Sequence, residues 1–147
     1  MHQPLVSALA IVAALVSTLA EAAPTPEQAA VCVAALKSRA EPLAQRVRQG
    51  ELSVEAQLLT VVTDSFAFIG TSYKQGVEQD QANVLLKDAE TRQLRLPPAE
   101  LARVQDSCQA QGEQLLANAN GLERLFVRHA ARARVDRLKR PVTPPAP

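Results

Sequence analysis

Few residues of this chain carry side chains suited to covalent or metal chemistry. The two cysteines are Cys32 and Cys108, and beyond the first 22 residues the one histidine is His129. Covalent haem attachment needs a Cys-x-x-Cys-His motif, and a structural zinc site needs four closely spaced Cys or His ligands. Neither pattern occurs, so we expect no metal and no cofactor. His129 follows Leu122 and Leu125 at helical spacing, which predicts a partly buried or interface histidine rather than a catalytic base.

The serines and acidic residues also lack a catalytic arrangement. No serine has the Gly-x-Ser-x-Gly setting of a hydrolase nucleophile, and no glycine-rich loop is available to bind phosphate. Glu78, Asp80, Asp88 and Glu90 cluster in the sequence, but their spacing is not that of an EF-hand loop, so we expect a solvated helix face. Asp64 is expected to have a surface or capping role. These observations predict a protein that is not an enzyme.

The main functional candidate is a basic segment near the C-terminus. Between Arg124 and Arg140 there are seven basic residues and one acidic residue, although the net charge of the whole chain is only +1. The predicted contact surface consists of Arg124, Arg128, Arg132, Arg137 and Lys139. The other side of the same helix is expected to carry Leu122, Leu125, Phe126 and Ala133.

A helix of this kind suits an anionic lipid, a polyanion or an acidic protein partner. The alternative is a solvated basic helix end, which the negative end of the helix dipole also favours. Nucleic acid is not an expected ligand, because Phe126 is the one aromatic residue in this segment that a base could stack on.

The N-terminal segment predicts export. An apolar run from Leu5 to Leu19 precedes Ala20-Glu21-Ala22, which places small residues where a signal peptidase reads them. No Lys or Arg precedes the run, which departs from the usual pattern. A membrane anchor is the alternative, but the run is shorter than the about 20 apolar residues that span a bilayer. We therefore predict a signal peptide over residues 1–22, a periplasmic or secreted mature protein, and no transmembrane segment after processing.

Apolar spacing predicts helices along the mature chain. Thr25-Pro26-Glu27-Gln28 reads as a capped helix start, and Gly50 as the stop. Pro42 lies inside this helix and predicts a bend at residues 38–42. The apolar face of the first helix is formed by Val33, Leu36, Ala40, Leu43 and Val47. A second helix, capped by Ser53, has its predicted core stripe at Leu59, Val62, Phe66, Ile69 and Tyr73.

The second half of the chain contains further breaks. We expect a turn over residues 76–80, with Asp80 capping a shorter third helix that ends at Leu96-Pro97. Pro98 opens a fourth helix, and a break at Asn120-Gly121 precedes the basic helix. Residues 141–147 hold four prolines and are expected to be a disordered tail. The predicted fold is all-α, an antiparallel bundle of four to five helices over residues 23–140.

The two cysteines test this topology. In an oxidising compartment Cys32 and Cys108 are expected to form one disulfide. If residues 53–93 were one straight helix, the cysteines would be about 20 Å apart, whereas a disulfide needs Cα atoms roughly 5.5 Å apart. A chain reversal near Gly76 brings the two cysteines to nearly the same height along the axis of the bundle. The disulfide therefore favours the reversal. With the cysteines side by side, the residues after 113 would project beyond the bundle unless the chain folds back a second time at Asn120.

Two classes of function remain open at this stage. The first is a non-enzymatic exported protein that acts by contact with another protein or the cell envelope, through the basic helix. The second is a carrier of a small ligand or cofactor, with a pocket between helices near Phe66, Phe68, Tyr73 and Phe126. The sequence names neither the partner nor the oligomeric state.

Overall fold

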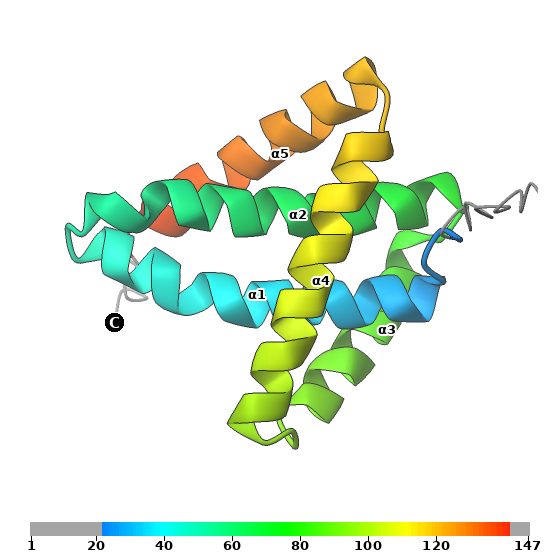
Figure 1. The fold of residues 1–147 in the computed structure, drawn as a ribbon, viewed down its shortest axis with the longest axis horizontal. Coiled ribbons are helices and arrows are strands. Elements are labelled where there is room, and N and C mark those ends of the chain that lie inside the picture. The colour runs from blue at the N-terminus through cyan, green and yellow to red at the C-terminus, as the bar shows by residue number, and fades with distance from the viewer. Residues whose placement is uncertain (1–21, 142–147) are drawn as a thin grey trace, which may run out of the picture.

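Five α helices make up residues 22–141, the part of the chain that the computed structural model describes (Figure 1). They are α1 (Pro26–Arg48), α2 (Glu55–Lys74), α3 (Gln79–Gln93), α4 (Pro98–Asn118) and α5 (Gly121–Lys139), with a short 3-10 turn, η1 (Leu52–Val54), before α2. No strand occurs within residues 22–141. The predicted all-α fold is confirmed. Most of the predicted signal peptide and all but the first residue of the proline-rich tail lie outside the described residues.

Helix α1 begins and ends where the sequence predicts. The Thr25 Oγ1 atom accepts a hydrogen bond from the Gln28 amide, and the Gln28 side chain accepts one from the Thr25 amide, which completes a capping box. At the other end Gly50 has a φ of +94°, a conformation that favours glycine. The helix continues without interruption through Pro42, and the predicted bend there stays a prediction. Leu36 and Leu43 are buried, as expected from the apolar face.

Helix α2 is the central helix of the fold and packs against α1, α4 and α5. Its buried residues include Leu58, Val61 and Phe68, and of the predicted stripe Val62 is buried while Leu59 and Phe66 are half-buried against the core. The prediction is wrong at the C-terminal end of that stripe, where Ile69 is exposed and Tyr73 is 81% exposed. The apolar residues of α2 occupy two neighbouring rows, and the packing of α4 and α5 decides which row is buried.

Segment Leu52–Lys74, which includes α2, is long and apolar enough to cross a membrane by length and composition, with a mean hydropathy of 1.3. The core helix of a soluble protein has the same properties. Within this fold Leu58, Val61 and Phe68 are covered by other helices, so the apolar content of α2 is used in the core.

The chain reverses between α2 and α3, as the cysteine argument requires. Gly76 has a φ of +78° in this turn. The predicted capping role of Asp80 is wrong, because Glu78 is the N-cap residue and Asp80 lies in the first turn. An acidic side chain in the first turn is still favourable, since it faces the positive end of the helix dipole.

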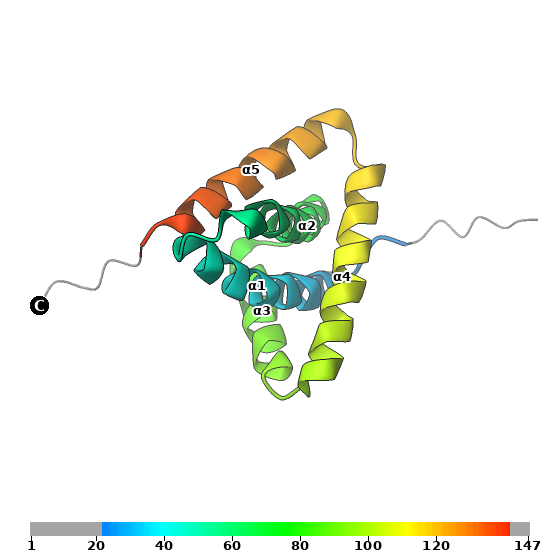
Figure 2. The ribbon, with the colours of Figure 1, turned by 60° about the vertical axis from the view of Figure 1, so that its left-hand side comes forward.

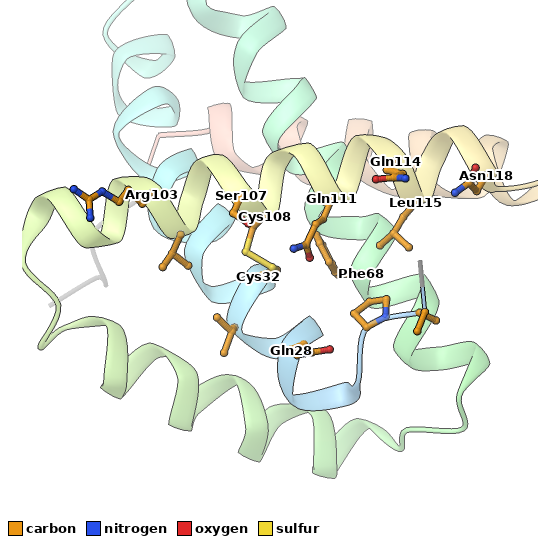
Figure 3. Close-up of a pocket in the computed structure, with 15 residues that line it drawn as sticks. Gln28, Cys32, Phe68, Arg103, Ser107, Cys108, Gln111, Gln114, Leu115 and Asn118 are labelled. Atoms are coloured by element: carbon orange, nitrogen blue, oxygen red, sulfur yellow. A yellow bond between two sulfur atoms is a disulfide. The ribbon is translucent and has the colours of Figure 1, made fainter. Parts of the chain in front are cut away.

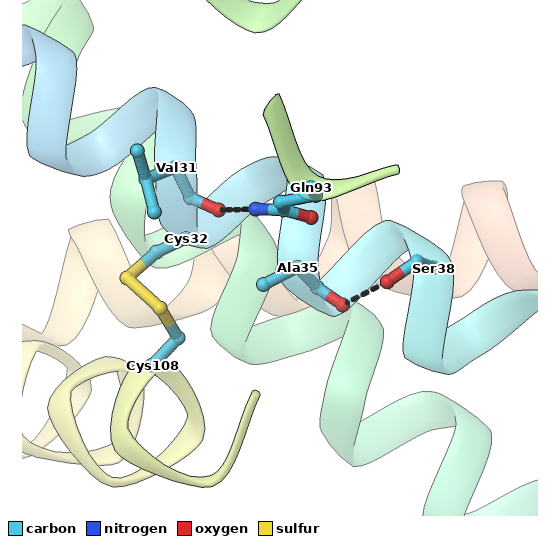
Figure 4. The surroundings of a disulfide bond; sticks show 6 residues. All are labelled: Val31, Cys32, Ala35, Ser38, Gln93 and Cys108. Carbon is cyan, nitrogen blue, oxygen red and sulfur yellow. Dashed lines mark hydrogen bonds between the residues drawn. A yellow bond between two sulfur atoms is a disulfide. The ribbon is translucent and has the colours of Figure 1, made fainter. Parts of the chain in front are cut away.

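Helix α4 crosses α1 and α2 steeply and is bonded covalently to α1 (Figures 1 and 2). Cys32 and Cys108 form the predicted disulfide, with a Cα–Cα distance of 5.1 Å. Around it, the Gln93 side-chain amide donates to the carbonyl of Val31 at 2.8 Å, so the end of α3 is also attached to α1 (Figure 4). Three helices are therefore joined within a short stretch of α1.

Helix α5 begins after the predicted break. Asn120 is its N-cap: its side chain accepts from the Glu123 amide at 2.9 Å, and the Glu123 carboxylate accepts from the Asn120 amide. The helix then returns along α2 (Figure 2). Ion pairs join the two helices at both ends: Lys74 to Glu123 at 3.1 Å, and Lys139 to Glu55 at 2.6 Å.

Candidate functional site

The packed side of α5 is not the side expected from its large apolar residues. Ala131 and Val135 are the buried residues of this helix, and Val127 and Leu138 are half-buried beside them. Leu122, Leu125 and Phe126 were expected on the side of α5 opposite the basic residues, and each is about two-thirds exposed, at 64%, 65% and 66%. Small residues let α5 lie close to α2, which turns the larger apolar side chains outward.

The five basic residues of the predicted contact surface divide into two groups. Lys139 is engaged with Glu55, and this hydrogen bond raises the pKa of the Lys139 ammonium above its ordinary value although desolvation opposes the change. Arg124 is half-buried, and its guanidinium lies 3.4 Å from the carbonyl oxygen of Ala117 in α4. These two side chains hold α5 in place rather than offering charge to a partner.

Arg128, Arg132 and Arg137 are exposed. Within residues 22–141 none of the three lies within 4.0 Å of a carboxylate. His129 is exposed as well, so of its two expected settings partial burial is wrong, and an interface position stays a prediction. We call the following set the outer face of α5: Leu122, Leu125, Phe126, Arg128, His129, Arg132 and Arg137. It joins an apolar first half to a cationic second half on one helix.

A cleft that the sequence analysis missed lies beside this face. Helices α2, α4 and α5 enclose about 410 Å³ there, and Asp64 of α2 lines the cleft. The predicted surface or capping role of Asp64 is wrong, because its side chain is only 1% exposed and lies within α2, where one carboxylate oxygen, Oδ2, has no hydrogen-bond partner among residues 22–141. Burial, followed by the negative charge of Glu113, raises the pKa of Asp64 to about 7.

Gly112 explains why Asp64 is covered so closely. A Cβ atom at position 112 would lie 2.7 Å from the Cβ of Asp64 and 3.1 Å from its Cα, so only glycine allows α4 to approach α2 at this point. The signal was present in the sequence. Asp64 follows Val61 and precedes Phe68 at spacings of three and four, and Gly112 follows Cys108 at a spacing of four.

The aromatic residues proposed to line one pocket lie in separate places. Phe68 is fully buried, and with Gln111 and the Cys32–Cys108 bond it lines a cavity of about 550 Å³ beneath α4 (Figure 3). Tyr73 and Phe126 line a different cavity of about 680 Å³ between α2, α4 and α5. Phe66 lines neither cavity.

The acidic cluster of α3 is a solvent-facing one, as expected. Glu78, Asp80 and Asp88 are exposed, and Glu90 is half-buried where its carboxylate pairs with Lys37 of α1 at 2.6 Å. In the part of the chain that the structure describes, no group of three or more His, Cys, Asp or Glu residues is placed to hold a metal ion.

No protein-family model, no curated protein and no solved structure matches this chain.

Proposed function

We propose that this protein acts without catalysis, by binding an anionic surface of the cell envelope through the outer face of α5. The observation that carries the proposal is the exposure of Leu122, Leu125 and Phe126 beside three arginines that have no acidic partner in residues 22–141. Contiguous exposed apolar side chains on a soluble domain mark interaction sites.

The chemistry of the two halves fits a lipid surface. Leucine and phenylalanine side chains enter the boundary between headgroups and acyl chains, and arginines beside them attract anionic headgroups. Each basic residue near such a surface contributes about 1 kcal/mol. Because ion pairs fix both ends of α5 to α2, the helix needs no folding step before it binds.

The proposed location is the periplasm or the exterior of the cell. A disulfide between Cys32 and Cys108 is typical of oxidising compartments. The signal peptide predicted for residues 1–22 supports the same location. An anionic envelope surface would be accessible to the protein there.

Co-sedimentation with lipid vesicles tests the cationic half. The wild-type protein is expected to bind vesicles that contain an anionic lipid, and to bind neutral vesicles far less. Replacing Arg128, Arg132 and Arg137 with Glu should abolish this binding and leave the helix content unchanged. The matched control replaces Arg92, Arg95 and Arg103, which are exposed around the α3–α4 turn, with Glu. It makes the same change in net charge, so equal loss of binding in both variants would refute the assignment to α5.

A second set of variants tests the apolar half. Replacing Leu122, Leu125 and Phe126 with Ser should weaken binding to anionic vesicles and shift it to lower salt, because only the electrostatic attraction remains. The control makes the same number of Ser substitutions at Leu52, Val84 and Leu94, which are also exposed. If no vesicle binds and the outer face instead captures one defined acidic protein, the partner is a protein and the lipid proposal fails.

One observation favours the alternative function of a small-ligand carrier. A groove of about 870 Å³ between α1, α2 and α3 is lined by Ile69, Tyr73, Leu85 and Leu86, which is a size and composition that suit an apolar ligand. If the protein is such a carrier, a long-chain fatty acid should raise the melting temperature of the wild type, and Ile69→Glu should remove that effect.

A further inference from the structure

The cleft at Asp64 brings opposite charges together without pairing them. Two carboxylates, from Asp64 of α2 and Glu113 of α4, and two guanidinium groups, from Arg128 and Arg132 of α5, line the same space of about 410 Å³. No carboxylate oxygen of this cleft lies within 4.0 Å of either guanidinium. The cations therefore lie on the wall of the cleft that α5 forms, and the anions lie on the walls that α2 and α4 form, with space for a ligand between them.

The α2 wall needs hydrogen-bond donors. Asp64 lines the cleft, and its buried Oδ2 atom has no hydrogen-bond partner in the part of the chain that the structure describes. The Thr60 hydroxyl donates its proton to the carbonyl of Ala56, and the Thr63 hydroxyl donates to the carbonyl of Leu59, so both oxygens offer only lone pairs to the cleft. A group with several N–H bonds and a positive charge would satisfy this wall, and rotation about the Cβ–Cγ bond of Asp64 presents either carboxylate oxygen to it.

The α5 wall needs an anion. Arg128 and Arg132 are one turn apart on the same helix, so their guanidinium groups can bind one anion together. A single arginine can bind both oxygens of a carboxylate through two parallel hydrogen bonds, whereas a phosphate has enough oxygens and negative charge to bind two arginines.

We propose that this cleft binds a small zwitterion that carries a primary ammonium and a phosphate, the phosphoethanolamine group. The ammonium donates to Asp64 and Glu113, and the phosphate lies between Arg128 and Arg132. Leu59 and Leu116 supply apolar contact for the two carbon atoms that join the charged ends. The inference goes beyond the proposed function, because a soluble zwitterion needs no membrane in order to bind.

Titration calorimetry with soluble O-phosphoethanolamine tests the site. Phosphocholine has the same phosphate but a quaternary ammonium without N–H bonds, so the wild type should bind phosphoethanolamine about tenfold more tightly. Asp64→Asn should remove most of this preference, whereas a merely structural role of Asp64 would leave it intact. Equal affinity of the wild type for the two compounds, or no binding of either, would overturn the proposal.

Proton release provides a readout that is independent of affinity. At pH 6 the ammonium should drive a proton from Asp64, so the measured heat should change with the ionisation enthalpy of the buffer. The Asp64→Asn variant should show no such dependence. Binding of phosphoethanolamine to the wild type without proton release would exclude Asp64 as the ammonium site.

The arginine wall has a matched control. Arg128→Gln with Arg132→Gln should weaken phosphoethanolamine binding at least tenfold, and Arg134→Gln with Arg137→Gln, two exposed positions of α5 outside the cleft, should leave binding unchanged. Vesicles of phosphatidylethanolamine and of phosphatidylcholine then separate the two sources of the group. Preference for the former identifies a lipid headgroup, whereas binding of the soluble compound alone identifies a free ligand and still upholds the site.

Discussion

The stability of the protein should fall as the pH rises from about 4 to about 7, and Asp64 should be the cause. Burial raises the pKa of this carboxyl from 3.8 to about 7. Between these values the folded protein holds a proton on Asp64 that the unfolded chain has lost. Raising the pH therefore favours the unfolded chain, and the effect levels off once Asp64 is ionised in both states.

The size of the effect follows from the pKa shift. Each pKa unit corresponds to about 1.4 kcal/mol, so the shift of Asp64 makes folding less favourable by on the order of 4 kcal/mol at pH 8 compared with pH 4. The side chain is only 1% exposed, so water screens its charge less than that of a surface carboxylate. Asp64→Asn removes the ionisable group and keeps the shape of the side chain.

Chemical denaturation followed by circular dichroism measures this effect. The free energy of unfolding of the wild type and of Asp64→Asn should be compared at pH 4, 6 and 8. All other ionisable groups are common to both proteins, so the difference between them isolates Asp64. The variant should gain stability relative to the wild type as the pH rises. If the unfolding free energies of the two proteins change in parallel from pH 4 to pH 8, the reasoning is refuted.

Three further predictions concern the packing and the ends of the helices. Replacing Cys32 and Cys108 together with Ala should cost about 4 kcal/mol in the free energy of unfolding, because the bond closes a long loop; an unchanged denaturation midpoint would contradict this. Gly112→Ala should cost roughly 1–3 kcal/mol through overpacking against the α2 backbone. The control Gly70→Ala should be neutral or stabilising, since its nearest atom would be 4.0 Å away, and similar losses in both variants would show that close approach at Gly112 is not the reason. Asn120→Ala should cost about 1 kcal/mol by removing the cap of α5, with faster amide hydrogen exchange in the first turn of that helix; exchange unchanged at Glu123 would show that the cap is not needed.

Local signals predicted three helix boundaries, whereas the helix caps expected at Ser53 and Asp80 are wrong. Thr25 with Gln28, the left-handed Gly50, and the break at Asn120 each act within a few residues, so the sequence around them is sufficient. The Cys32–Cys108 pair added a long-range restraint, because only a reversal of the chain near Gly76 brings both cysteines to one level. Together these features determine the number of helices and the order in which they fold back.

The burial of individual faces was not predictable in the same way. Helix α2 has two adjacent apolar rows, and Asp64 lies in the row that is most deeply buried, although an acidic residue is normally exposed. On α5 the larger apolar residues were expected to form the apolar side of the helix, but the buried residues are Ala131 and Val135. Both errors have one cause, since helical spacing shows which residues share a face but not which face a neighbouring helix covers.

Fluorescence of a single tryptophan on α5 gives the most direct test of the central claim. The chain contains no tryptophan, so Leu125→Trp introduces the only one, on the outer face of α5. Its emission should shift to shorter wavelength when anionic vesicles are added. The control Leu94→Trp lies at the α3–α4 turn, far from α5 in Figure 2, where the native side chain is 88% exposed, and its emission should not change. No shift at position 125, or equal shifts at both positions, would contradict the claim that this protein binds an envelope surface through α5.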